Sequence, residues 1–425
     1  MIHPVSRAAA LLIFIVLGVL TSLAAGISIP VLSQTAGSPG RVLPITDPTQ
    51  LRRLDFADLE YVGAFRLPAT ESNGDSFSSG GGPLAFNPER NSLFAGTRSG
   101  RVAEVSLPTA SRSQSIAELP MADYLQPFAD PAEGRMKEVA TEGAALAGLL
   151  VQPRRLYGSG VIYYDANNTQ SVSHFSRPIN LSDRGASAMR RVGARGRSGL
   201  VAGYMATVPP EWQSKLGGPA LTGQCCVPIV SRTSWGPAAF AWNPADLEGT
   251  SDVAATPLVY YPAEHPTLGQ WDGSNPTYGG TIQMGGLAVI AGTRTALFVG
   301  RNGLGPFCYG NGTGDPALAN TTSRDGEHYC YDPSNSDKGQ HAYPYRYQMW
   351  AYDLNDWAAV RAGDRDPWNV KPYGVWPFEL PFPEPGVRVG GVAYDAATQR
   401  LFVSQLHADR DGYAYRALIH VFHIP

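Results

Sequence analysis

The sequence predicts an all-β fold of short strands joined by many turns. The 425-residue chain contains 47 glycines and 35 prolines, and only 16% of its residues are charged. Apolar runs with the 3.6-residue period of a helix are scarce, whereas short apolar segments bounded by Gly, Pro, Asn and Asp recur. A hydrophobic content of 43% is ample for a buried core. These features favour strands along the whole chain.

The N-terminal 58 residues are expected to lie outside the folded domain. A short start ending at Arg7 precedes the apolar run AAALLIFIVLGVL, and Ser22-Leu23-Ala24 supplies small residues for cleavage. This order is typical of a signal peptide, assigned to residues 1–25, and an uncleaved membrane anchor is the alternative. Residues 26–58 begin with many Pro, Ser, Thr and Gly and are interpreted as a linker. The domain, residues 59–425, is therefore expected to be secreted, periplasmic or at the cell surface.

A three-strand pattern recurs five times within residues 59–425. It is clearest at the C-terminus, where GGVAYDA, RLFVSQ and ALIHVFHIP follow one another. The other copies read GGPLAFNP, SLFAGTR, RVAEVSLP; then LLVQP, GSGVIYYD, SVSHFSRP; then LVAGYMATVP, CVPIVSR, PAAFAWNP; and then GGLAVIAG, ALFVGR, YQMWAYDL. TPLVYYP and YGVWPFEL are candidate fourth strands. Repetition at a spacing of several tens of residues indicates a repeat architecture.

These units resemble the blades of a β-propeller, and the resemblance covers residues 59–425. It predicts five four-stranded blades. The segment YVGAFRLP has no hairpin partner, so we expect it to pair beside ALIHVFHIP and close the ring without an open edge. A β-sandwich is the alternative, but it does not explain the repeated third-strand endings SLP, SRP, WNP and HIP. The sequence has no repeated W-D signature and no Kelch pattern, so the resemblance implies an architecture and no reaction.

The four cysteines are interpreted as structural. Cys308 and Cys330 flank a Gly- and Asn-rich excursion that cannot bury itself, so we predict a disulfide worth roughly 3 kcal/mol across its base. Cys225 and Cys226 allow a vicinal disulfide or two buried thiols, and we expect thiols. No C-x-x-C or H-E-x-x-H motif is present, so no metal site is predicted.

We expect no required cofactor. The segment DPSNSDKG could hold a structural Ca²⁺ through oxygen ligands, although it lacks the ligand order of an EF-hand. A solvated turn is the interpretation that we prefer for this segment.

Basic residues recur at one position of the repeat. Because neighbouring strands in a blade alternate in direction, the ends of the second strands and the starts of the first strands share one face. The residues at the second-strand ends are Arg98, Asp165, Arg232, Arg301 and Gln405. Guanidinium groups suit carboxylate, sulfate or phosphate, so the three arginines are candidates to converge on an anionic ligand. The alternative is that each arginine pairs with a neighbouring carboxylate.

Long polar loops on the same face supply further candidates. The candidate catalytic residues are His407, His341, His265 and Tyr164. The candidate substrate-binding residues, besides the three arginines, are Arg388, Gln283, Glu142, Trp271, Tyr343 and Tyr413. Each aromatic residue has the alternative role of packing its own loop. His174, His420 and His423 lie within third strands, where we expect them to pack.

These residue types favour binding of an anionic polysaccharide, uronic or sulfated, with cleavage by β-elimination. An Arg or Gln would neutralise the uronate carboxylate and acidify the adjacent C–H, and a His or Tyr would take the proton. The alternatives are a non-catalytic carbohydrate-binding propeller and a glycoside hydrolase that uses Glu142 with Glu264 or Asp272. Acidic residues at the first-strand entries are too few for a convincing hydrolase.

Other partners are not expected. The formal net charge of −3 gives no overall attraction to nucleic acid, and export argues against it. Membrane contact is expected only through an uncleaved N-terminal segment. We expect the chain to act as a monomer.

Overall fold

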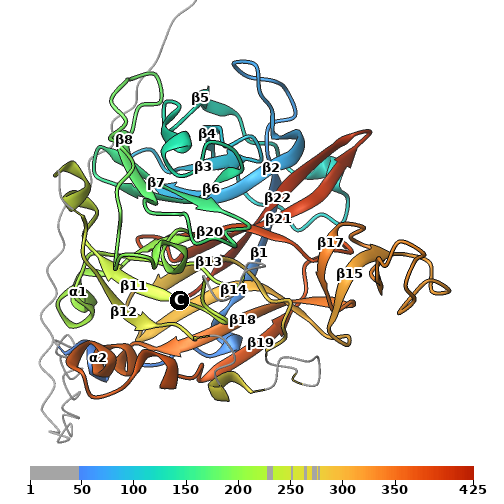
Figure 1. Cartoon of the computed structure of the whole chain (residues 1–425). Helices are drawn as coiled ribbons and strands as arrows, with labels where there is room; N and C mark the ends of the chain where they lie inside the picture. Colours follow the sequence, from blue (N-terminus) through green and yellow to red (C-terminus); the bar gives the residue numbers. More distant parts are fainter. Residues whose placement is uncertain (1–46, 227–232, 250–251, 263–265, 270–274, 276–277) are drawn as a thin grey trace, which may run out of the picture. The chain divides into compact units, whose positions relative to one another are not determined.

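A computed structural model of the chain describes residues 47–425 except 227–232, 250–251, 263–265, 270–274 and 276–277 (Figure 1). In the described residues the strands far exceed the helices, and the main sheets are antiparallel. The prediction of an all-β fold is therefore confirmed. Among the helices of this part of the chain, none is long and apolar enough to cross a membrane.

The strands form five main sheets, which follow one another along the chain. The first sheet contains β2 (Gly80–Asn87), β3 (Ser92–Thr97), β4 (Val102–Ser106) and β5 (Tyr124–Ala129). The second contains β6 (Ala144–Gln152), β7 (Arg155–Ile162) and β8 (His174–Pro178). The third contains β9 (Met205–Thr207), β10 (Ala220–Thr222), β11 (Ala239–Trp242) and β12 (Ala255–Val259). The fourth contains β13 (Gln283–Ile290), β14 (Thr295–Gly303), β18 (Tyr345–Asp353) and β19 (Gly374–Phe378).

The fifth main sheet joins the two ends of the domain. It contains β20 (Val389–Asp395), β21 (Arg400–Asp411), β22 (Ala414–His423) and β1 (Glu60–Arg66). As expected, the N-terminal strand β1 pairs antiparallel with β22, from Glu60 opposite His423 to Arg66 opposite Leu418. A small separate sheet is inserted between β14 and β18, and it consists of β15 (Cys308–Thr313), β16 (Tyr329–Tyr331) and β17 (Lys338–His341).

Helical segments are short. The α-helices in the described residues are α1 (Pro210–Leu216) and α2 (Leu354–Ala362). The 3-10 turns are Pro48–Gln50, Phe56–Asp58, Phe77–Ser79, Ile116–Glu118, Arg135–Glu138, Ser198–Leu200, Pro244–Glu248, Pro266–Leu268 and Pro367–Asn369. Helix α2 begins where the Asp353 carboxylate accepts the backbone N–H of Asn355, and it ends at Gly363, whose φ is 86°.

One strand of the third sheet differs from the prediction. The second strand is β10, Ala220–Thr222, whereas we expected CVPIVSR to form it. Strand β10 is only three residues long and follows α1 in the stretch between LVAGYMATVP and CVPIVSR, so it carries almost no periodic signal. Residues 227–232 of the CVPIVSR segment lie outside the described residues.

The first strands of the five main sheets contact one another in sequence. Strand β2 contacts β6, β6 contacts β9, β9 contacts β13, β13 contacts β20, and β20 contacts β2. Glycine permits this approach, because a Cβ on Gly82 would lie 2.0 Å from the carbonyl oxygen of Gly390. A Cβ on Gly148 would likewise lie 2.0 Å from the carbonyl oxygen of Gly203. The strand register shifts at this level in β2, β6, β13 and β20, as at a β-bulge.

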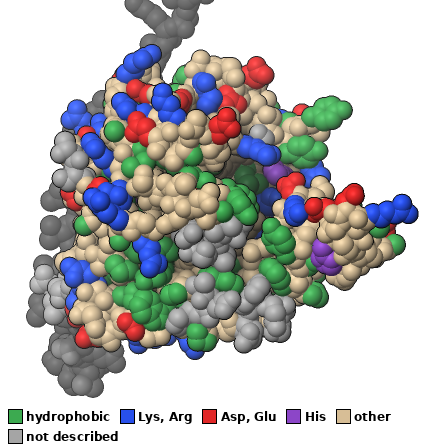
Figure 2. Space-filling view, in the orientation of Figure 1, with side chains coloured by type: hydrophobic (Ala, Val, Ile, Leu, Met, Phe, Trp, Pro, Cys, Tyr) green, Lys and Arg blue, Asp and Glu red, His purple; other side chains and the backbone are tan. Residues whose placement is uncertain are grey.

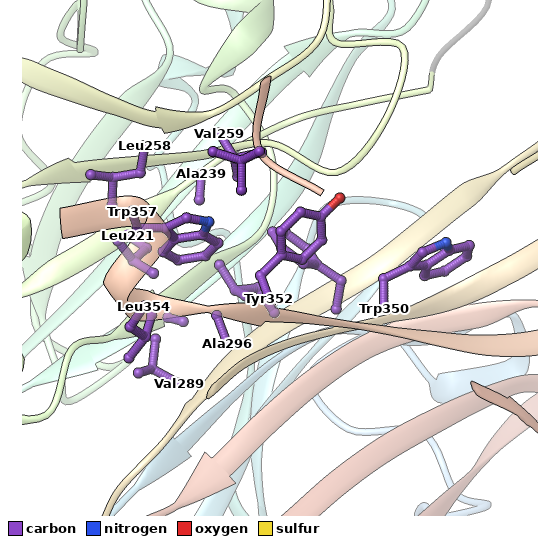
Figure 3. Packing of buried hydrophobic residues seen from close by; sticks show 14 of the residues in the cluster. Leu221, Ala239, Leu258, Val259, Val289, Ala296, Trp350, Tyr352, Leu354 and Trp357 are labelled. Atoms are coloured by element: carbon purple, nitrogen blue, oxygen red, sulfur yellow. The ribbon is translucent and has the colours of Figure 1, made fainter. Parts of the chain in front are cut away.

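Large aromatic residues fill the core between the third and fourth sheets. Trp357 of α2 and Trp350 and Tyr352 of β18 are almost fully buried, and Leu221 and Val289 belong to the same cluster (Figure 3). On the fourth sheet, the segment before β1 is also held: Leu54 donates its backbone N–H to Thr295 Oγ1 at 2.9 Å, and Arg53 pairs with Asp353 at 2.9 Å. These contacts give the described part of residues 26–58 a defined place on the domain.

Candidate functional site

Basic side chains gather around one histidine where β20 begins. Arg388 immediately precedes β20, and His407 lies in β21. Arg388, Arg410 and Arg98 are all close enough for their charges to act on the pKa of His407. The charge of Arg388 also acts on the pKa of Arg301 in β14. We call Arg98, Arg301, Arg388, His407 and Arg410 the basic cluster.

His407 is half-buried and its imidazole is held by packing. Its ring lies edge-on to Tyr415, with ring centroids 5.9 Å apart, and its backbone φ is 62°. Burial lowers the pKa of His407, the charges of Arg388, Arg410 and Arg98 lower it further, and Glu384 opposes them. The imidazole is therefore neutral at neutral pH, which is the state that a proton-accepting group needs.

Arg388 is fixed by an acidic partner and by the neighbouring excursion. Its Nη1 donates to Glu384 Oε1 at 2.7 Å, and its Nη2 donates to the carbonyl oxygen of Ser334 at 2.9 Å. Glu384 is buried and also accepts the backbone N–H of Arg388 at 3.1 Å. Arg388 thus joins the start of β20 to the segment between β14 and β18.

Arg301 is a buried cation. Its guanidinium carbon lies 4.1 Å from the centroid of the Tyr345 ring, and Nη1 donates to the carbonyl oxygen of Gly386. Burial lowers the pKa of Arg301, and Tyr345 and Asp332 act in the opposite direction. Arg301 also lies opposite Gln283 in the pairing of β14 with β13.

Arg98 and two tyrosines form the exposed part of the site. Arg98 follows β3, is exposed, and forms no hydrogen bond or ion pair in the described residues. Tyr163 and Tyr164 follow β7 and are 56% and 60% exposed. Partial burial raises the pKa of Tyr163 and the charge of Arg301 opposes this, so of these two exposed tyrosines Tyr163 is the one on which the basic cluster acts electrostatically. Sequence reasoning selected Tyr164 and missed Tyr163, since nothing in the sequence separates the two.

Two projections flank this region. Strands β21 and β22 extend as a long hairpin with the fully exposed Tyr413 at its tip, and the β15–β17 sheet extends separately (Figure 1). Figure 2 shows basic and histidine side chains gathered in the hollow between the two projections.

His341, a predicted catalytic residue, has both ring nitrogens engaged. It is buried, and Nδ1 lies 2.9 Å from Asp332 Oδ2 while Nε2 lies 3.0 Å from the carbonyl oxygen of Asp337. Both ring nitrogens are thus occupied by partners within the excursion. His341 therefore serves the internal structure of the excursion in this arrangement.

Asp332 is the centre of that network. Its carboxylate accepts hydrogen bonds from His341, Tyr345 and Ser334. Burial would raise the pKa of Asp332, but the hydrogen bonds outweigh it and hold the pKa at about 2. Both carboxylate oxygens are occupied by protein donors, so this residue of DPSNSDKG is not arranged to hold a cation.

The predicted disulfide between Cys308 and Cys330 is present. It links β15 to β16 at the base of the excursion. His328 lies beside it, and its ring and the two sulfurs lie within 4.8 Å of one another. Because both sulfurs are in the disulfide, they are not available as thiolate ligands for a metal.

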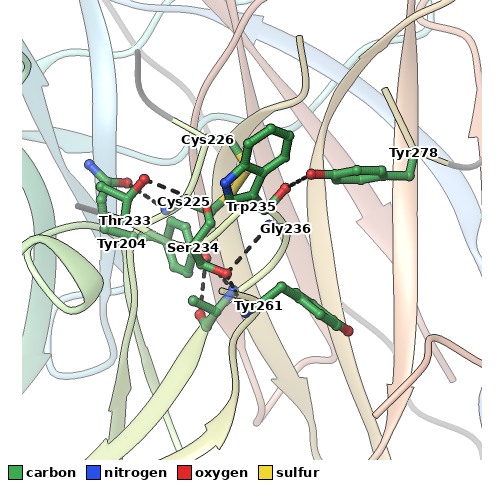
Figure 4. Close-up of a disulfide and its surroundings, with 11 residues drawn as sticks. Tyr204, Cys225, Cys226, Thr233, Ser234, Trp235, Gly236, Tyr261 and Tyr278 are labelled. Atoms are coloured by element: carbon green, nitrogen blue, oxygen red, sulfur yellow. Dashed lines mark hydrogen bonds between the residues drawn. A yellow bond between two sulfur atoms is a disulfide. The ribbon is translucent and has the colours of Figure 1, made fainter. Parts of the chain in front are cut away.

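Cys225 and Cys226 form a vicinal disulfide, so the expectation of buried thiols is wrong (Figure 4). The Cys226 backbone N–H donates to the carbonyl oxygen of Ser234 at 2.9 Å, and the Cys226 φ is 66°. In Figure 4 Trp235 lies beside the sulfurs, and the Tyr278 hydroxyl donates a hydrogen bond to the carbonyl oxygen of Trp235. Adjacency in sequence does not reveal whether two cysteines are bonded.

The other residues singled out from the sequence are dispersed. Gln283 and Glu142 are exposed, and Tyr343 packs between Tyr331 and Tyr345. Asp165 caps the turn at Thr169 and Gln170, and Gln405 donates to Tyr347 and Phe382. The residues that lie outside the described ones are Arg232, His265, Trp271, Glu264 and Asp272.

His174 and His420 are buried and have a partner at each ring nitrogen, as the packing interpretation expected. His174 contacts Ser173 and Thr222, and His420 contacts Tyr61 and Gln405. Burial lowers the pKa of each to about 3.

Comparison with known proteins gives weak likenesses only. No family model and no curated protein matches the chain. Similar solved structures include a luciferin-regenerating enzyme, with 7% identity over 87% of this chain and 94% of that chain and a TM-score of 0.35. A mitotic checkpoint complex is 11% identical over 81% of this chain and 61% of that chain, with a TM-score of 0.27. The tail fiber of Staphylococcus aureus phage P68 is 9% identical over 87% of this chain and 53% of that chain, with a TM-score of 0.34. Likenesses at this level carry no argument about function.

Proposed function

We propose that residues 59–425 form a five-bladed β-propeller. Its support is the cycle of contacts from β2 through β6, β9, β13 and β20 back to β2, together with the pairing of β1 and β22. In such a ring the first strands lie around the axis, so Arg388, at the entry to β20, and Gln283, at the start of β13, belong to one axial face.

We further propose that this face binds an anionic polysaccharide of the uronic or sulfated class. The observation that carries the proposal is the convergence of three arginine charges on one neutral histidine. Arg98 is exposed and unpaired among the described residues, and a guanidinium in that state is ready to pair with a carboxylate or sulfate. Arg388 and Arg301 are held rigidly by Glu384 and Tyr345, so little ordering is needed on binding.

The chemistry that fits these groups is β-elimination on a uronate. Arg98 and Arg388 would neutralise the carboxylate, which makes the C5 proton acidic. His407 would take that proton, the C–H electron pair would become the C4–C5 double bond, and the C4–O4 bond would break. The leaving O4 would take a proton from a tyrosine hydroxyl, for which Tyr163 is the candidate near the cluster.

The test is the ultraviolet absorbance of unsaturated uronate, followed with a panel of uronic-acid polymers. We expect His407→Ala to lower the rate about 10²–10⁴-fold and to leave affinity nearly unchanged, because a general base contributes on this scale. His423→Ala is the matched control, since His423 is outside the basic cluster. A panel that gives no unsaturated product with the unaltered protein would exclude the lyase.

Binding without cleavage is the second candidate, and the engagement of both His341 nitrogens favours it, because His407 is then the one candidate catalytic histidine left free among the described residues. In that case His407→Ala weakens binding, and no product is formed. A hydrolase that uses Glu142 would release reducing sugar without unsaturated ends.

A further inference from the structure

A cavity lies at the C-terminal ends of the five first strands, opposite the ends where the basic cluster lies. Its volume is about 440 Å³, and all of β2, β6, β9, β13 and β20 line it. The segments that follow these strands form its mouth, among them Pro88–Glu89, Pro153, the start of α1 at Pro210–Glu211, and Ala291. The basic cluster is found where the same strands begin, so the cavity and the proposed polysaccharide site are separate.

The cavity narrows away from its mouth. The first strands touch where their glycines lie: a Cβ on Gly285 of β13 would be 2.2 Å from a side-chain carbon of Val389 in β20. Beyond that level, towards the strand ends, Leu84, Leu149, Leu287 and Val392 line the space and are each less than 5% exposed. The pocket is therefore lined largely by buried aliphatic side chains of the first strands.

Aliphatic lining favours an apolar occupant. A pocket of this volume is in the range of small-molecule sites, and water in an apolar space lacks the two to four polar partners that hold it. Transfer of a hydrocarbon chain from solvent into this space is therefore favourable, at about fourfold in affinity for each methylene buried.

The charges at the mouth select the head group. The lining residues include Glu89, Glu211 and Asp395, and they include no lysine, arginine or histidine. Asp395 is paired with Arg400, and Glu211 accepts only a long hydrogen bond of 3.3 Å from Gly292. Glu89 is exposed, and its carboxylate has no partner in the described residues. Two carboxylates are thus left to attract a cation and repel an anion.

We propose that this cavity binds a small cationic amphiphile, with its hydrocarbon body between the first strands and its ammonium group at Glu89 and Glu211. A fatty acid or alkyl sulfate of the same length fits the space equally well but meets the two carboxylates. The proposal therefore requires that the cavity bind the cationic amphiphile more tightly than the anionic one of the same length.

The test uses alkyltrimethylammonium ions of six, eight and ten carbons and the matching alkyl sulfates, all below micelle formation, with calorimetry on the full chain. We expect one site, affinity that rises with chain length, and at least tenfold tighter binding of the cation than of the matching sulfate. Glu89→Gln with Glu211→Gln should reduce that preference to below threefold, because hydrocarbon burial is unchanged.

Blocking the mouth separates this site from general surface binding. We expect Ala291→Trp to abolish binding of the ten-carbon cation, while Ala362→Trp at the exposed end of α2 leaves it unchanged. Equal affinity for the cation and the sulfate, several weak sites, or binding that survives Ala291→Trp would each overturn the proposal. Polyuronate binding at the basic cluster is measured separately in both variants. Failure of the cavity proposal can therefore be told apart from failure of the polysaccharide proposal.

Discussion

At the scale of single residues, the properties of His407 depend on its charged neighbours. Arg388→Met should raise the pKa of His407 towards its ordinary value of 6.5, because it removes a nearby cation and leaves Glu384 uncompensated. Titration of the imidazole by NMR measures this shift directly. Arg400→Met is the matched control, since Arg400 pairs with Asp395 at the far end of β20. An unchanged His407 pKa in Arg388→Met would show that the charge of Arg388 does not act on this imidazole.

The two buried histidines predict how stability depends on pH. The pKa of each is about 3 in the folded protein, against an ordinary value of 6.5 that we take for the unfolded chain. Between pH 3 and pH 6.5 the unfolded chain therefore binds more protons than the folded protein does. The free energy of unfolding should therefore fall as pH drops below about 6.5, by at most about 1.4 kcal/mol per pH unit for each histidine. We expect His174→Gln and His420→Gln to give shallower slopes in urea titrations between pH 6.5 and 4. Slopes equal to that of the unaltered protein would contradict this account.

At the scale of elements, the excursion between β14 and β18 depends on one buried carboxylate. Asp332→Asn removes the negative charge that His341 and Tyr345 contact, and we expect a local loss of about 1–3 kcal/mol. Limited proteolysis and hydrogen exchange within residues 308–341 measure it. Asp337→Asn is the control, because Asp337 contributes its backbone carbonyl to His341. Equal protection in the two variants would show that the Asp332 network does not hold the excursion.

Strand identity could be predicted from the sequence where the strands are long and apolar. The units around β2, β13 and β20 carry repeated Gly-Gly pairs and β-branched residues, and the orphan strand β1 was assigned correctly to β22. Strand β10 was missed because three residues cannot display a period. The contact of His341 with Asp332 could not be predicted for a different reason: Asp332 is nine residues away in a segment of turn residues, and nothing in the sequence specifies that pairing.

At the scale of the whole molecule, close approach of the first strands is the feature that the sheets share. Gly82→Ala places a Cβ 2.0 Å from the carbonyl oxygen of Gly390, so backbone must move, and we expect a global loss of roughly 1–3 kcal/mol or more. Gly339→Ala is the control, because no atom lies within 4 Å of a Cβ built there. Calorimetry should give a lower Tm for Gly82→Ala than for Gly339→Ala. Equal Tm values would mean that this contact is not made.

The most direct test of the proposed function is binding of a polyuronate and of a neutral polysaccharide of similar length, each at low and raised salt. We expect the polyuronate alone to bind, with affinity that falls as salt rises, since exposed charges are screened. Arg98→Gln with Arg388→Gln should weaken that binding at least tenfold. Equal binding of both polymers, or binding that neither salt nor the double substitution alters, would contradict the assignment of this face to an anionic glycan.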